Sequence, residues 1–113
     1  MLRYEISLNR VHDRVRIREG SEVLDLRVDA DPMRMVAGLN EAQRQLRAIG
    51  DDSPPEALQA AARHFAEVIF GAEQAARLMM FYRGDAACVI NVCGRYFSER
   101  LSKLIDKAQR RMK

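Results

Sequence analysis

Few residues in this chain of 113 could bind a metal, and their spacing argues against it. Cys88 and Cys93 lie five positions apart, which on a helix places the two thiols about 140° apart around the axis. They could not hold one ion together. His12 and His64 have no cysteine or histidine neighbour at a spacing that zinc sites use. We therefore predict no metal site, and we interpret the two cysteines as small reduced thiols rather than as a disulfide framework.

The residues needed for catalysis are also missing or badly placed. The sequence contains no threonine, and Cys93 falls on an apolar helix face, where a thiol stays protonated and unreactive. All six glycines are isolated, so there is no glycine-rich phosphate loop. The adjacent carboxylates Asp51 and Asp52 lie in a polar segment, where a solvated turn is the simpler interpretation. We predict that the protein is not an enzyme, with no catalytic residue and no cofactor.

Positive charge is concentrated at the C-terminal end of the chain. Residues 95–113 carry seven basic and two acidic side chains, so the net charge of +3 comes from this segment and the rest is slightly acidic. Cations suit the C-terminal end of a helix, where the helix dipole is negative, and we prefer this explanation. The alternative is a small nucleic-acid-binding regulator that uses the basic C-terminal helix. Residues 98–113 contain no aromatic side chain for stacking on bases, which makes nucleic acid the weaker choice of partner.

Apolar side chains are more numerous between residues 78 and 97 than one small core can use. Five successive positions, 78–82, are apolar or aromatic, and 86–93 is apolar all round except at Asn91. Such a helix is either central in its domain or shared with a partner, and we favour the partner. Adjacent methionines suit a surface for varied apolar ligands, and filling of core gaps is the alternative. The candidate partner contacts are Leu78, Met79, Met80, Phe81, Tyr82, Val89, Val92 and Tyr96.

The first third of the chain has the alternating pattern of β-strands. Apolar and polar residues alternate over residues 2–8, 14–18 and 24–28, and short connections join these three segments. Short connections favour neighbouring antiparallel strands. Residues 1–29 are therefore predicted to form a three-stranded antiparallel meander with one apolar face, which helices must cover.

Two helices are predicted after these strands. Asp31, followed by proline, is typical of a helix start, and we expect a helix over residues 30–50. Ser53 and Glu56 have the spacing of a capping box, in which each side chain bonds a backbone amide of the first turn. They predict a second helix over residues 53–70, and the polar, proline-containing segment before it is the one linker-like stretch in the chain.

Two further helices are predicted in the C-terminal part. A short helix over residues 72–82 ends before Gly84, and Asp85 has the position of an N-cap. The last helix is predicted over residues 85–110. Its apolar residues follow steps of three and four, which is the period of a regular α-helix, and Phe97 lies on this stripe.

These elements describe a single α+β domain spanning residues 1–113, with a three-stranded meander followed by about four helices. A chain of this length has a thin stability margin, so assembly is a plausible supplement. No stretch approaches the roughly 20 apolar residues of a membrane span. Charges at every second position of residues 1–6 argue against a signal peptide. We expect a cytoplasmic protein that makes no contact with a membrane.

The C-terminal half resembles a group of phage proteins. The residues that carry the resemblance form two blocks: IFGxEQAxxLxxFYxGD over residues 69–85, then CVIxVCGRYFxERL over residues 88–101. This pattern resembles the tail assembly chaperones of siphophages and prophages of Gram-positive bacteria, which are small proteins encoded between the tail tube protein and the tape measure protein. The resemblance covers about residues 65–110.

The resemblance implies an interaction protein of the host cytoplasm. Such chaperones coat the long, apolar tape measure protein and keep it soluble until tube subunits polymerise around it; the tail tube protein is a second candidate partner. Members often occur in two lengths, and this chain would correspond to the short form, self-associating as a homo-oligomer. The resemblance adds Phe70 and Phe97 to the candidate contacts, and we expect Phe97 to be the member that lies in the core.

Overall fold

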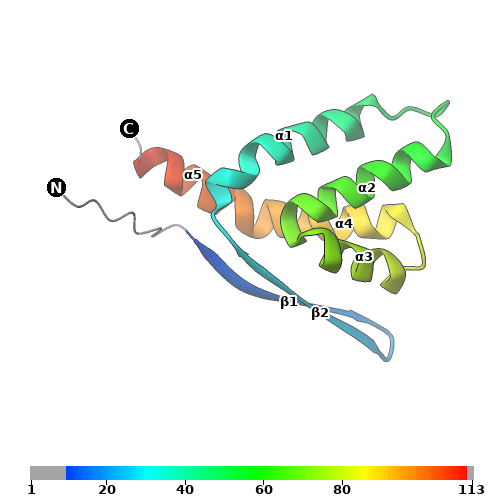
Figure 1. The fold of residues 1–113 in the computed structure, drawn as a ribbon, viewed down its shortest axis with the longest axis horizontal. Helices are drawn as coiled ribbons and strands as arrows, with labels where there is room; N and C mark the ends of the chain where they lie inside the picture. The colour runs from blue at the N-terminus through cyan, green and yellow to red at the C-terminus, as the bar shows by residue number, and fades with distance from the viewer. Residues whose placement is uncertain (1–9, 112–113) are drawn as a thin grey trace.

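The computed structural model describes residues 10–111. They form an α+β fold with a two-stranded antiparallel sheet, β1 (Val11–Glu19) and β2 (Glu22–Ala30), beneath a layer of helices (Figure 1). Gly20 and Ser21 connect the strands, and Gly20 has φ 62°, which suits glycine in a tight hairpin turn. The α+β class is confirmed. The strand expected over residues 2–8 lies outside the described residues, so the described sheet has two strands instead of three.

The alternation of side chains along the hairpin gives the sheet two different faces. Val11 and Ile17 of β1 are buried, together with Leu24, Leu26 and Val28 of β2. The alternate positions of both strands are exposed and mostly charged: His12, Arg14, Arg16, Arg18, Asp25, Arg27 and Asp29. The apolar face therefore packs on the helices, because burying these side chains removes apolar surface from water, while the charged face points away from the helices.

Within residues 10–111 the helical layer contains five α-helices and one π-helical turn. Their bounds are α1 (Pro32–Ala48), α2 (Pro55–Phe70), α3 (Ala72–Phe81), α4 (Ala86–Tyr96), the π-helix η1 (Phe97–Leu101) and α5 (Ser102–Arg111). α1 packs on α2, α2 packs on α4, and α2 and α3 contact β2. No helix within residues 10–111 is long and apolar enough to cross a membrane.

The starts of the first two helices differ in their capping. The Asp31 side chain accepts a hydrogen bond from Met33 N at 3.0 Å, so the predicted N-cap is confirmed. The predicted capping box at Ser53 is wrong. Ser53 Oγ accepts instead from the backbone N–H of Gly50 at 3.0 Å, and α2 begins after Pro54 without a side-chain cap. The Ser53 hydroxyl is thus used in the turn before α2, and the helix begins at Pro55 instead of at residue 53.

The last helix is continuous but not regular. α4 passes through η1 into α5, and the fully buried residues Cys93 and Leu101 lie eight positions apart across the π turn. In a regular α-helix eight residues overshoot two turns by about 80°. A π turn is wider and takes up about one residue, which brings Leu101 back onto the face of Cys93. The expectation that Phe97 lies in the core is wrong, because Phe97 begins the π turn and is only half-buried.

This geometry predicts that deletion of Ser98, an exposed residue of the π turn, is better tolerated than an insertion beside it. Deletion converts η1 into a regular turn and keeps Leu101 facing the core. Inserting one alanine after Ser98 rotates all of α5 by about 100° and exposes Leu101 and Ala108. Thermal unfolding followed by circular dichroism should show a loss of a few degrees for the deletion and loss of most of the folding transition for the insertion. Equal losses would contradict this interpretation of the π turn.

Candidate functional site

A groove of about 320 Å³ runs between β1 and α4. Its apolar lining comes from both elements and from the residue that follows α3. The lining residues are Val15, Arg16, Ile17, Arg18, Glu19, Tyr82, Asn91, Val92, Arg95, Tyr96 and Glu99. Three of the predicted contact residues, Tyr82, Val92 and Tyr96, therefore meet in one place. The groove can hold apolar side chains of a partner, with arginines at its rim to pair with acidic groups.

The turn between α3 and α4 fixes where Tyr82 points. Arg83 and Gly84 have φ values of 54° and 80°, so the chain turns sharply in the left-handed region. The N–H of Gly84 bonds Met79 O at 2.9 Å, which closes the end of α3. Asp85 then caps α4 by accepting from Cys88 N at 3.3 Å, as predicted. The two helices thus meet at a defined angle with the Tyr82 ring between them and the hairpin.

Both tyrosine hydroxyls of the groove are anchored on the hairpin. Tyr82 donates to Glu19 Oε1 at 3.1 Å, and Tyr96 donates to Asp13 Oδ2 at 2.7 Å. Burial, assisted by the bond to Glu19, raises the pKa of Tyr82 to about 12, and burial also raises the pKa of Tyr96. Both phenols therefore stay neutral at physiological pH. Their rings are held in place before any partner arrives.

Asp13 joins β1 to the last helix. Besides the Tyr96 hydroxyl, its carboxylate accepts hydrogen bonds from Arg100 Nε at 2.7 Å and Arg100 Nη2 at 3.0 Å. These bonds from Arg100 hold the pKa of Asp13 below its usual value. Because Arg100 lies in η1 and Tyr96 ends α4, one partly buried carboxylate fixes the wall of the groove.

A second hollow, of about 460 Å³, lies at the tip of the hairpin and meets the groove at Tyr82 and Glu19. It is bounded by the hairpin turn, residues 19–22, and by Phe81, Arg83 and Cys88. The Phe81 and Tyr82 rings pack edge to face with their centroids 5.1 Å apart. The two hollows form one surface around Tyr82.

The two edges of the sheet differ. On β2, the Gln74 side chain pairs with the backbone of Arg27: its Oε1 accepts from Arg27 N at 2.7 Å and its Nε2 donates to Arg27 O at 2.6 Å. Within residues 10–111, β1 pairs with β2 alone, so its other edge borders the groove without a strand neighbour. The β2 edge is thus covered at Arg27 by a side chain of α3, and the groove lies along the edge of β1.

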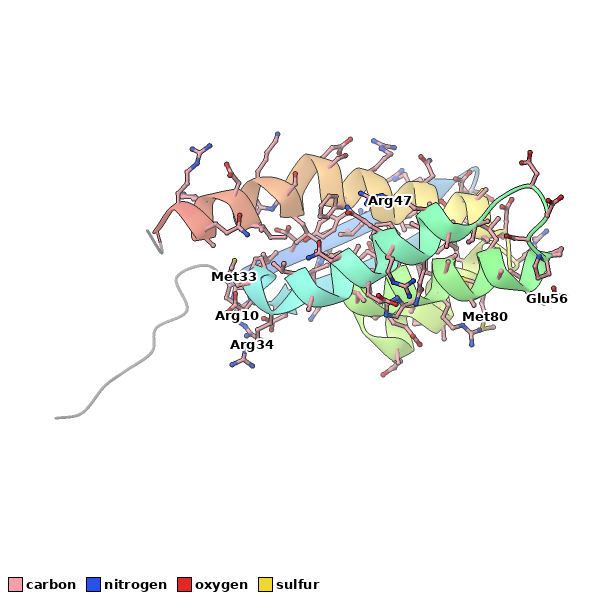
Figure 2. All side chains as sticks on the ribbon, turned by 90° about the horizontal axis from the view of Figure 1, so that it is seen from above. Arg10, Met33, Arg34, Arg47, Glu56 and Met80 are labelled. Atoms are coloured by element: carbon pink, nitrogen blue, oxygen red, sulfur yellow. The ribbon has the colours of Figure 1, made fainter. Side chains whose placement is uncertain are left out.

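The ten predicted contact residues divide into three groups. The structure buries four of them in the protein's own core: Phe70, Leu78, Met79 and Val89. Five are half-buried: Phe81, Tyr82, Val92, Tyr96 and Phe97. Met80 is 78% exposed and lies outside the groove, near the edge of the molecule (Figure 2). Within the run of residues 78–82, the first two side chains are therefore buried in the core and the last three reach the surface.

No protein-family model matches this chain, and neither a curated protein nor a solved structure is similar to it. The function therefore has to be argued from the groove and its neighbours. Its other lining residues, among them Val15 and Arg95, were not predicted from the sequence as contacts. The alternation of β1 could have suggested Val15, but nothing in the sequence places the edge of β1 beside α4.

Neither cysteine lines the groove, although Cys88 lines the second hollow. Burial raises the pKa of the Cys93 thiol to about 12, which keeps it protonated. Asp85 is the main cause of a raised pKa at Cys88. Among residues 10–111, no three histidine, cysteine, aspartate or glutamate side chains gather closely enough to hold a metal ion.

The Asp13 carboxylate predicts a specific acid sensitivity. Its pKa is lowered in the folded state, so its contribution to stability is present above its unfolded pKa of about 3.8 and is lost as the pH falls through the folded value. Asp13→Asn should lower stability at pH 7 by about 1–2 kcal/mol, because hydrogen bonds to a charged group are lost. Its melting temperature should also change less than that of the wild type between about pH 5 and pH 3.

Glu41→Gln is the matched control, since Glu41 pairs with Arg44 within α1 and away from the groove. That variant should keep the melting temperature at pH 7 nearly unchanged. Parallel acid profiles for Asp13→Asn and the wild type would show that Asp13 does not hold the hairpin to the last helix.

Proposed function

We propose that this protein is a phage tail assembly chaperone, which binds the apolar helical tape measure protein and self-associates during tail assembly. The observation that carries this proposal is the groove between β1 and α4, with its two anchored tyrosines. A groove of this kind suits an amphipathic segment, whose apolar side chains enter it while its polar ones stay at the rim.

The groove has the properties expected of a binding surface that is formed in advance. Tyr82 and Tyr96 are already fixed by Glu19 and Asp13, so little side-chain entropy is lost when a partner binds. Tyrosine is also a favoured anchor at interfaces, because it combines a large apolar ring with a polar tip. Val92, together with the two rings, would supply the apolar contact area.

The rim supplies charge of both signs. Arg16 and Arg18 of β1 and Arg95 of α4 lie along the groove, with Glu19 and Glu99 close by. Arginines at this rim could pair with acidic residues that flank the apolar face of a partner helix. The proposed binding surface is narrower than the sequence predicts, because four of the ten candidate residues lie in the core.

The biological setting belongs to the same proposal. The protein would act in the cytoplasm of the bacterial host, hold the tape measure protein in solution, and release it as tail tube subunits assemble. A homo-oligomer would follow from many copies binding along one long partner. The thin stability margin of a chain of 113 residues is consistent with a protein that works in an assembly.

Co-expression tests this function directly. The gene neighbourhood is examined first for a tape measure gene, and that tape measure protein is then produced with and without this chain. The wild type should keep the tape measure protein in the soluble fraction and co-purify with it. Val92→Lys places a charge in the groove and should reduce the recovered soluble complex at least about tenfold, since burying an unpaired charge opposes binding.

Met80→Ser is the matched control, because Met80 is the exposed apolar residue outside the groove. It should leave the yield of the complex unchanged. Failure of the wild type to keep the tape measure protein soluble would contradict the proposed function. A loss with Met80→Ser but not with Val92→Lys would contradict the assignment of the groove.

A further inference from the structure

The face of the sheet that points away from the helices is rich in arginine. In the antiparallel register Arg14 lies directly opposite Arg27, and Arg16 lies opposite Asp25. The second pair forms an ion pair at 2.9 Å, whereas two like charges directly across a sheet repel each other. Within residues 10–111 neither Arg14 nor Arg27 forms an ion pair with a carboxylate. This cross-strand arrangement costs stability in the isolated molecule.

Asp25 sits among more cations than it can neutralise. Its hydrogen bond with Arg16 is the main cause of its lowered pKa, and the charges of Arg14 and Arg77 lower it further. Arg77 is an exposed residue of α3, so the helix extends the cationic surface beyond the hairpin. We name this surface the arginine face; its residues are Arg14, Arg16, Arg18, Arg27 and Arg77.

A compact acidic surface lies elsewhere on the same molecule. The connection between α1 and α2 carries Asp51 and Asp52, and Glu56 lies in the first turn of α2. All three are exposed, and residues 50–56 contain no lysine or arginine. Two hydrogen bonds between Gly50 and Ser53, each of 3.0 Å, give this acidic loop a defined shape.

The acidic loop and the arginine face are at different sites. Figure 1 shows the connection between α1 and α2 on the side of the helical layer that is away from the hairpin. Figure 2 places Glu56 at the opposite end of the molecule from Arg10 and Met33. One copy therefore cannot bring its own loop onto its own sheet, whereas two copies can.

We propose that the arginine face of one copy binds the acidic loop of a second copy. Because two different surfaces meet, the contact is head to tail, and each copy keeps one free surface of each kind. Repetition gives a ring or an open row of copies. The inference rests on the proposed function, because a long, extended partner would bind many copies of the chain side by side.

A second copy explains the charges better than a nucleic acid does. Asp25 and Asp29 lie on the same face of the sheet and would repel phosphates. The strand positions of this face carry no phenylalanine, tyrosine or tryptophan on which a base could stack. Exposed ion pairs are weak one by one, so the contact forms at low salt or where many copies are held close together.

Charge reversal on both surfaces tests the proposal. In sedimentation equilibrium at about 20 mM salt the average mass of the wild type should rise with concentration, and at about 0.5 M salt it should return to that of a monomer. The variants Asp51→Lys/Asp52→Lys and Arg14→Glu/Arg27→Glu should each associate at least about tenfold more weakly. An equimolar mixture of the two should recover association, because each variant again meets an opposite charge.

The control is Lys103→Glu/Lys107→Glu on α5, which changes net charge by the same amount as the arginine variant and should associate like the wild type. A wild type that stays monomeric at low salt, or a mixture that fails to associate, would overturn the proposal. The proposal would also be overturned if the wild type and the aspartate variant bound a DNA duplex and the arginine variant did not. None of these substitutions changes Tyr82, Val92 or Tyr96 of the groove. Co-expression with the tape measure protein therefore tests the proposed function separately from association between copies.

Discussion

The arrangement of this protein depends on one carboxylate. Asp13 sits on the inward side of β1 and accepts bonds from Tyr96 and Arg100, which are more than eighty positions away along the chain. Its side chain is only 19% exposed, so removing Arg100 would leave this carboxylate without its compensating charge. Through these bonds the hairpin and the last helix hold a fixed distance from each other, and the groove exists because of that distance.

The π turn is the second constraint, and it is linked to the first. Arg100 reaches Asp13 from η1, and the same turn brings Leu101 back into the core. In a regular helix with the same residues, Cys93 of α4 and Leu101 at the end of η1 could not both face the core. The extra residue in the turn allows both to do so. At the opposite edge of the sheet the Gln74 side chain pairs with the backbone of β2 at Arg27, and the groove lies along β1.

Local patterns in the sequence predict the class of the fold and many helix ends, because they depend on neighbouring residues. The alternation in β2 and the caps at Asp31 and Asp85 are examples. Ser53 shows the limit of such patterns, since the same hydroxyl could serve either the helix or the preceding turn. Periodicity alone could not reveal the π turn, because the steps of three and four between the apolar residues also fit a regular α-helix.

The candidate site was predictable only in part, for a related reason. Sequence shows that residues 78–97 contain too many apolar side chains, but not which of them face inward. Val89 and Phe97 exchange their expected roles, Val89 being fully buried and Phe97 half-buried, because the orientation of α4 is set by its packing on α2. The edge of β1, the Asp13 carboxylate and the arginine face all depend on contacts across the chain, which no local pattern records.

The central claim is that the groove between β1 and α4 is where the apolar partner binds. Hydrogen–deuterium exchange on the purified complex with the tape measure protein measures this directly, in comparison with the free protein. The account predicts slower exchange at the backbone amides of the β1 edge, at residues 14–18, and little change at the exposed surface of α1. Slower exchange confined to α1 and α2, with the amides of β1 unchanged, would contradict it.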